Sequence, residues 1–180
     1  MGSGLRLGEL LGLQWKEVDL DTARLRVRRR ANNRGKLLEG AKSKRSLRTV
    51  SLPPIAVEAL KAHKSFLAEE KKRWDGVWTD MDLVFPAATG LVQQLSSHTW
   101  RLTKLCQSFG IKVTMHGLRH THASLLIHRG VHPKVISERL GHSSIAITMD
   151  TYGHLFPDMG EAAEQIELVL RDQKVTKAVI

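Results

Sequence analysis

The chain has 180 residues, of which 42% are hydrophobic, so intrinsic disorder is excluded and one domain with a buried core is expected. No run approaches the roughly 18 apolar residues of a membrane span, and the single cysteine, Cys106, cannot form an internal disulfide, which indicates a reducing compartment. The formal net charge is +10, and residues 1–50 carry most of it, with 13 Lys and Arg against 5 Asp and Glu. Such one-sided basicity favours nucleic acid as a partner, although a solvated basic loop gives the same composition.

The first part of the chain predicts a short helix followed by a small antiparallel sheet. Leucines spaced along Leu5 to Gln14 predict a short buried helix. Ala23 to Arg28 alternates apolar and basic residues, which is typical of a half-buried strand, and Leu47 to Leu52 predicts another. Turn-forming residues from Asn32 to Gly35 lie between these strands. We expect basic side chains on the open face of this sheet.

The remainder of the chain predicts helices, apart from a short extended segment at Leu83 to Pro86. Several of these helices are followed by glycine, which is typical of a left-handed C-cap. The expected fold class is therefore mainly α with a small antiparallel β-sheet (α+β). The predicted helices span Pro54 to Trp74, Ser97 to Phe109, His116 to His128, Pro133 to Leu140, Ser143 to Tyr152 and Pro157 to Arg171.

Polar residues gather in two of the predicted helices. Arg6 lies three residues before Glu9, a spacing that also fits an ordinary exposed ion pair along a helix. His116, Arg119 and His120 are spaced to share one helix face. Two histidines four residues apart can bind a metal, but no acidic ligand lies between them as zinc proteases require. An imidazole and a guanidinium at a helix start fit a phosphate site better, and a histidine-rich surface helix remains the alternative.

A third cluster runs from Leu140 to Ser144 and is followed by Tyr152, which is the only tyrosine in the chain. A lone tyrosine usually packs its ring and hydrogen-bonds its hydroxyl, so this residue by itself does not indicate chemistry. The order of all these segments along the chain is more informative than any one of them.

Taken together, the segments resemble the tyrosine recombinase family, also called the phage integrases. The family's arginine box is similar to Ser3 to Leu10, and its hairpin lysine corresponds to Lys42 within Ala41 to Pro53. Its second box is similar to His116 to Ser124, and its third to Leu140 to His154. The four motifs cover nearly the whole chain, and the resemblance implies the catalytic-domain fold of these DNA breaking and rejoining enzymes.

The resemblance also implies a reaction. In the family, a tyrosine attacks a DNA phosphodiester, forms a 3′-phosphotyrosyl bond and frees a 5′-hydroxyl, which later reverses the step without ATP or a metal. By position, Tyr152 is the nucleophile. Arg6 and Arg119 hold the non-bridging oxygens and offset the charge of the transition state. Lys42 is the general acid for the leaving 5′-oxygen, with Lys44 as the alternative because the hairpin loop aligns loosely.

Further site residues follow from the same motifs. His116 is expected to assist proton removal from the tyrosine or to bind the phosphate, and His142 to hydrogen-bond the phosphate beside the nucleophile. Glu9 is expected to support the site by hydrogen bonds. Structural or supporting roles are expected for His120, His122 and His154. Charge and position alone assign DNA-backbone contacts to Arg28, Arg29, Arg30, Lys44 and Arg45.

The family's full-length members carry a helical core-binding domain, and often an arm-binding domain, before the first box. Only five residues precede Arg6, so residues 1–180 are expected to be a C-terminal catalytic domain truncated at its N-terminus. The expected partners are double-stranded DNA at recombination sites and further copies of the chain, which form a tetramer through the C-terminal segment. The expected location is the bacterial cytoplasm at the nucleoid, with no cofactor, no metal and no membrane contact.

Two alternatives remain open at this point. A catalytically inactive, DNA-binding prophage remnant would keep the same fold. A metal-dependent nuclease or phosphatase built on the histidines would lose its activity to a chelator, whereas a recombinase would be indifferent to it.

Overall fold

The computed structural model describes residues 2–39, 47–156, 163–164, 166–168 and 170–171. Most of the residues that it describes in regular structure are helical. The helices are α1 (Leu7–Leu11), α2 (Pro54–Arg73), α3 (Leu95–Ser108), α4 (Met115–His128), α5 (Pro133–Leu140) and α6 (Ile145–Tyr152), with the 3-10 turns η1 (Trp15–Glu17) and η3 (Gly153–Leu155).

Two small antiparallel sheets precede the long helix α2. The first has the strand order β1-β2-β5 and places Leu25 opposite Val50, and the second is the hairpin β3-β4. The expectation of one sheet was therefore wrong in this detail: the chain leaves the first sheet at Arg28, and the turn at Asn32 closes a separate hairpin. The strands are β1 (Val18–Asp19), β2 (Arg24–Val27), β3 (Arg29–Ala31), β4 (Leu37–Glu39) and β5 (Arg48–Ser51).

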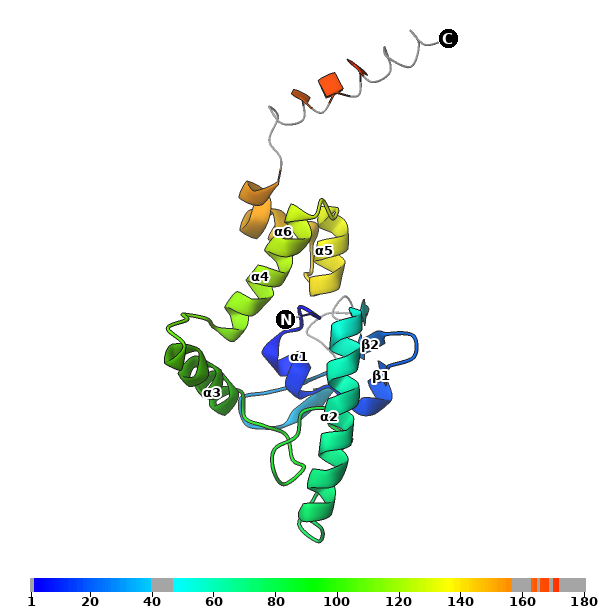
Figure 1. Ribbon diagram of the computed structural model, residues 1–180, viewed down its shortest axis with the longest axis vertical. Coiled ribbons are helices and arrows are strands. Elements are labelled where there is room, and N and C mark those ends of the chain that lie inside the picture. Colours follow the sequence, from blue (N-terminus) through cyan, green and yellow to red (C-terminus); the bar gives the residue numbers. More distant parts are fainter. Residues whose placement is uncertain (1, 40–46, 157–162, 165, 169, 172–180) are drawn as a thin grey trace.

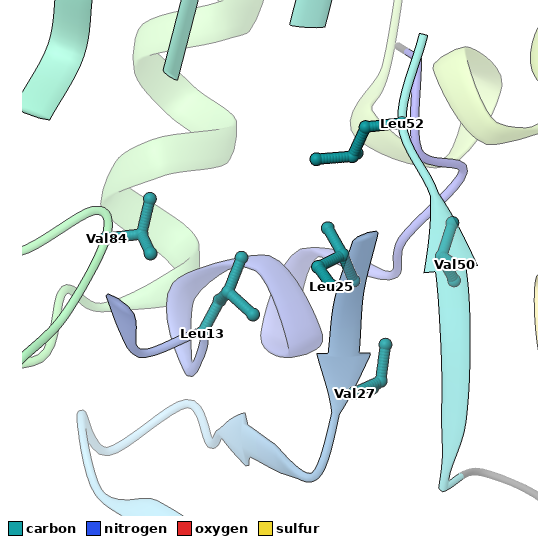
Figure 2. Close-up of a cluster of buried hydrophobic side chains, with 6 residues drawn as sticks. All are labelled: Leu13, Leu25, Val27, Val50, Leu52 and Val84. Carbon is teal, nitrogen blue, oxygen red and sulfur yellow. The ribbon is translucent and has the colours of Figure 1, made fainter. Parts of the chain in front are cut away.

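The alternation predicted for the first long strand is confirmed. Arg24 and Arg26 of β2 are exposed, whereas Leu25 and Val27 are buried. Figure 2 shows these two apolar side chains near Val50 of β5. Leu13, Leu52 and Val84, which lie outside the strands, complete this buried hydrophobic cluster. Its buried members are Leu13, Leu25, Val27, Val50, Leu52 and Val84.

The helices agree with the sequence pattern most closely where both ends carry a signal. α5 has the predicted bounds because Pro133 begins it and Gly141 ends it in the left-handed conformation, at φ 67°. α4 begins at Met115, one residue before the prediction, because the Thr114 side chain accepts a hydrogen bond from the backbone N–H of Gly117. The predicted helix from Pro157 to Arg171 lies largely outside the described residues.

The arrangement in space places α1 at the centre (Figure 1). α4, α5 and α6 gather at one end of the molecule, while the sheets and α2 occupy the other. α1 packs on β3, and α5 lies against β5, so residues near the N-terminus meet the second half of the chain. In the described part of the chain no helix is long and apolar enough to span a membrane.

Candidate active site

Arg6 lies at the start of α1, where it faces the end of α5. Its Nη1 donates to Glu9 Oε1 at 3.1 Å and to the Leu140 carbonyl at 3.4 Å, and its Nη2 donates to the Gly141 carbonyl at 3.1 Å. The side chain is nevertheless 44% exposed. The guanidinium is thus held in place at its base and open to a ligand on its other side.

Arg119 reaches the same place from α4. Its Nη1 donates to the Gly4 carbonyl at 2.7 Å and its Nη2 to the Leu140 carbonyl at 2.6 Å. Burial, together with the charge of Arg6, lowers the pKa of Arg119 to about 10, so the side chain stays charged at neutral pH. The two arginines predicted to bind one phosphate therefore converge on one carbonyl, that of Leu140.

A buried carboxylate balances these cations. Glu9 is 7% exposed and accepts hydrogen bonds from the Arg6 backbone N–H at 2.9 Å and from Arg48 Nη1 and Nη2 at 3.1 and 2.9 Å. Burial raises the pKa of Glu9, but the hydrogen bonds and charge of Arg48, helped by Arg6, outweigh it and the net pKa is lowered. Glu9 is therefore an anion that holds Arg48 and Arg6 in place.

The guanidiniums of Arg6, Arg48 and Arg119 all donate hydrogen bonds to carbonyls at the C-terminal end of α5. Arg48 Nε donates to the Arg139 carbonyl at 2.7 Å, next to the Leu140 and Gly141 carbonyls that bind the other two arginines. The last carbonyls of a helix have no partner within the helix and carry partial negative charge. A helix end that is turned by a left-handed glycine is therefore a ready acceptor for several cations.

A cavity of about 560 Å³ opens beside the two converging arginines. Its lining includes Arg6, Arg119 and His116 together with Arg28, Arg29 and Arg30. A phosphate that entered here would meet a cluster of guanidiniums, which bind phosphate oxygens in pairs.

The described histidines of this region are engaged in specific contacts. His142 Nδ1 lies 2.8 Å from Thr148 Oγ1. Burial, followed by the charges of Arg119 and Arg6, lowers the pKa of His142 to about 4, so its imidazole is neutral at pH 7. No group of three or more His, Cys, Asp or Glu side chains in the described residues is placed to hold a metal ion.

Tyr152 is the last residue of α6 and is 4% exposed. Its ring packs in an apolar cluster with Ala123, Ile127, Ile136 and Leu140. Its hydroxyl oxygen lies 2.8 Å from Nδ1 of His120. Burial raises the pKa of Tyr152, and the charge of Arg119 offsets part of that increase.

His116 lies on the exposed side of α4, one turn before His120. The two rings meet edge to face, with their centroids 4.4 Å apart. Burial, followed by the charges of His120 and Arg119, lowers the pKa of His116. Because His116 lines the cavity, its position favours the phosphate-binding role of the two that the sequence left open.

The predicted DNA-contacting residues have mixed surroundings. The Arg28 side chain is 57% exposed and lies 3.4 Å from Glu17. Arg29 is 21% exposed and pairs with Glu17 and, at 2.8 Å, with Glu39, so it joins β3 to β4. Arg30 lines the cavity. Lys42, Lys44 and Arg45 lie outside the described residues, so their predicted roles stay predictions.

Sequence reasoning did not find two residues of the site, Arg48 and Arg139, and it did not find the contact that a third, His120, makes with Tyr152. His120 received only a supporting role, although its spacing from His116 marked the same helix face. Arg48 carried no signal because its carboxylate partner is 39 positions away. Arg139 donates to His122 Nε2 and to the Gly2 and Ser51 carbonyls, each at 2.9 Å, and so ties three distant segments together.

Known proteins are similar to this chain in sequence and in fold. The chain is 36% identical over 171 residues to a tyrosine recombinase XerC-like protein of Caldanaerobacter subterraneus, an alignment that covers 87% of this chain and 44% of that protein. It is 34% identical over 170 residues to the integrase of Staphylococcus phage L54a, which covers 91% and 48%. The chain thus spans about half the length of these curated relatives.

Solved structures show the same fold. The Tn1549 transposon integrase, in complex with circular intermediate DNA, superposes with a TM-score of 0.75 at 19% identity, covering 93% of this chain and 56% of that one. The XerA recombinase crystal structure gives a TM-score of 0.67 at 26% identity, covering 92% and 52%. The mainly helical fold class with small antiparallel sheets is therefore confirmed. Since the phage integrase family model matches residues 1–159, the chain belongs to that family.

Proposed function

We propose that the chain is the catalytic domain of a site-specific tyrosine recombinase, which cleaves and rejoins DNA strands through Tyr152. One observation carries the proposal: Arg6 and Arg119 lie far apart in the sequence and donate to the same carbonyl, that of Leu140, at 3.4 and 2.6 Å. They line one cavity with His116. The names of the relatives, recombinase and integrase, support the same activity.

The proposed cleavage is a transfer of one phosphodiester. The Tyr152 oxygen attacks phosphorus, an O–P bond forms, and the bond from phosphorus to the 5′-oxygen breaks. The phosphodiester is conserved as a 3′-phosphotyrosyl bond, so a 5′-hydroxyl from the same or a partner strand can reverse the step. Arg6 and Arg119 would stabilise the negative charge that builds on the phosphate oxygens.

The geometry supports these arginine roles. A guanidinium has five N–H donors, and the backbone contacts described for Arg119 use two of them. Arg119 also lines the cavity, where a phosphate oxygen would meet its further donors. The support from Glu9 and Arg48 keeps the cations in place before DNA arrives, so little reorganisation is needed at the moment of reaction.

The remaining catalytic roles are proposed from the motifs. Lys42 would protonate the leaving 5′-oxygen. His116 would bind the phosphate at the cavity wall. His142, neutral at pH 7, would donate from Nε2 if the Thr148 hydroxyl donates to Nδ1, a tautomer assigned from the 2.8 Å contact.

The proposed partners are DNA and further copies of the chain. The DNA backbone would be contacted by Arg28, Arg29, Arg30, Lys44 and Arg45. Among the three that the structure describes, Arg28 is the most exposed. Ile166 and Leu170 in the C-terminal segment are 62% and 55% exposed, which favours docking on a neighbouring copy in a tetramer. The domain would act on bacterial DNA in the cytoplasm, at the nucleoid. An inactive remnant of the same fold is not favoured, because the described catalytic side chains converge.

A covalent-trapping experiment tests the proposal. A duplex covering the end of the mobile element that carries the gene is nicked, so that the short fragment diffuses away after cleavage. The chain is mixed with it in EDTA and run on a denaturing gel. A covalent band with the wild type and none with Tyr152→Phe is expected. A band that persists in Tyr152→Phe, or one that needs a divalent metal, contradicts the proposal.

A further inference from the structure

His120 is a titratable side chain that contacts the proposed nucleophile, Tyr152. Its Nδ1 lies 2.8 Å from the Tyr152 hydroxyl oxygen, and the two ring centroids are 5.5 Å apart. The contact joins α4 to α6 across 32 positions of the chain. A group that accepts a proton in a reaction must lie within hydrogen-bond distance of it, roughly 2.6–3.2 Å.

The surroundings of the hydroxyl make such a group necessary. Tyr152 is 4% exposed and packs among apolar side chains, so bulk water has little access to its proton. Burial also raises the pKa of Tyr152 above that of a free phenol, which makes a phenolate scarce at neutral pH. His116 is the histidine that the motif suggests for proton removal from the tyrosine. Its ring packs against His120, and it lines the cavity.

We propose that His120 accepts the Tyr152 proton during strand cleavage and returns it during rejoining; this inference rests on the proposed function. The phenol O–H breaks as the Nδ1 lone pair forms an N–H bond. The phenolate lone pair then forms the O–P bond, and the electron pair of the broken P–O bond stays on the 5′-oxygen, which is protonated by the proposed acid Lys42. In the reverse step each proton moves back.

The groups around His120 suit this role. His116 on α4 and His142 in the turn before α6 both interact electrostatically with His120, Arg119 and Arg6. The incoming phosphodiester is an anion, so it favours the imidazolium that forms during attack.

Two DNA substrates with different leaving groups distinguish the loss of the catalytic base from the loss of the catalytic acid. One duplex carries the natural 5′-oxygen at the scissile phosphate, and the other carries sulfur, which leaves without protonation because a thiol has a pKa of about 8.5. His120→Asn keeps a hydrogen-bonding group near the Nδ1 position but cannot take a proton. It should slow covalent-adduct formation by about 10²–10⁴-fold with both duplexes. Lys42→Ala should form the adduct slowly with the oxygen duplex, and the sulfur duplex should restore its rate.

His128→Asn is the matched control, because His128 lies exposed at the end of the same helix. It should leave both rates unchanged. An adduct rate for His120→Asn equal to that of the wild type, or its rescue by sulfur, would overturn the proposal. If the wild type itself gives no Tyr152-dependent adduct, the proposed function fails, which is a different result.

A second measurement needs no DNA. Tyr152 is the only tyrosine, so carbon-13 labelling of the tyrosine Cζ gives one nuclear magnetic resonance signal. In the wild type and in His128→Asn this signal should move as the neighbouring imidazole is titrated. In His120→Asn the movement should be lost, while in His116→Asn it should remain. A movement that persists in His120→Asn would show that another group holds the hydroxyl and would overturn the proposal.

Discussion

Glu9→Gln tests the idea that one buried carboxylate organises the arginines. The substitution keeps the size of the side chain and removes the charge that Arg48 and Arg6 bind. Arg48 and Glu9 are each 7% exposed, and breaking such a buried pair costs about 3–5 kcal/mol. The 44% exposed Arg6 adds no more than about 1 kcal/mol.

The expected loss in free energy of unfolding is therefore about 3–4 kcal/mol, because the glutamine oxygen still accepts one hydrogen bond. For a domain of this size that lowers Tm by roughly 6–15 °C. Urea and thermal unfolding followed by circular dichroism measure it. Glu70→Gln is the matched control, since its ion-pair partner Arg73 is 74% exposed and the pair contributes at most about 1 kcal/mol.

The effect of Glu9 also has a defined pH dependence. The pKa of Glu9 is lowered in the folded chain, so its stabilisation is complete above the unfolded pKa of 4.5 and is lost as the pH falls through the folded pKa. The wild type and Glu9→Gln should therefore converge in stability below pH 4.5. Equal stability of Glu9→Gln and Glu70→Gln at pH 7 would refute the reasoning.

Three further predictions follow from the same geometry. Gly141→Ala should destabilise the chain by about 2–4 kcal/mol in urea unfolding, because φ is 67° and a Cβ would lie 2.6 Å from Arg48 Nη1. The control is Gly110→Ala, which is also at positive φ but in open space and should cost only about 1–2 kcal/mol. The pKa of His142 is lowered from 6.5 to about 4 in the folded chain, so the free energy of unfolding should fall as the pH drops from 6.5 to 4. His142→Asn should remove about 1–2 kcal/mol of the loss between pH 7 and pH 5. A slope that His142→Asn leaves intact would refute this assignment. Covalent-adduct formation should be the same in EDTA and in magnesium, and inhibition by EDTA would favour metal-dependent chemistry.

The sequence predicted the elements that have local signals at both ends. α5 has Pro133 at its start and Gly141 after its end, and its bounds were predicted without error. β2 followed from alternation, which the structure repeats as exposed and buried residues. The hairpin β3-β4 was missed because Arg28, Arg29 and Arg30 hide the period of two that marks a strand.

The candidate site was only partly predictable for a similar reason. The motifs predicted that Arg6 and Arg119 lie close together, since each box carries its own residue pattern, and both side chains do donate to the Leu140 carbonyl. The pairing of Arg48 with Glu9 and of His120 with Tyr152 depends on how distant elements pack. No local periodicity encodes such contacts, so they emerge only from the fold.

The most direct test of the account is to identify the residue that carries the DNA. The covalent complex is trapped on the nicked duplex, digested with nuclease and protease, and analysed by mass spectrometry. One modified peptide is expected, with a nucleotide joined through its 3′-phosphate to Tyr152, the sole tyrosine. A nucleotide on a serine or histidine, or one joined through a 5′-phosphate, would contradict it.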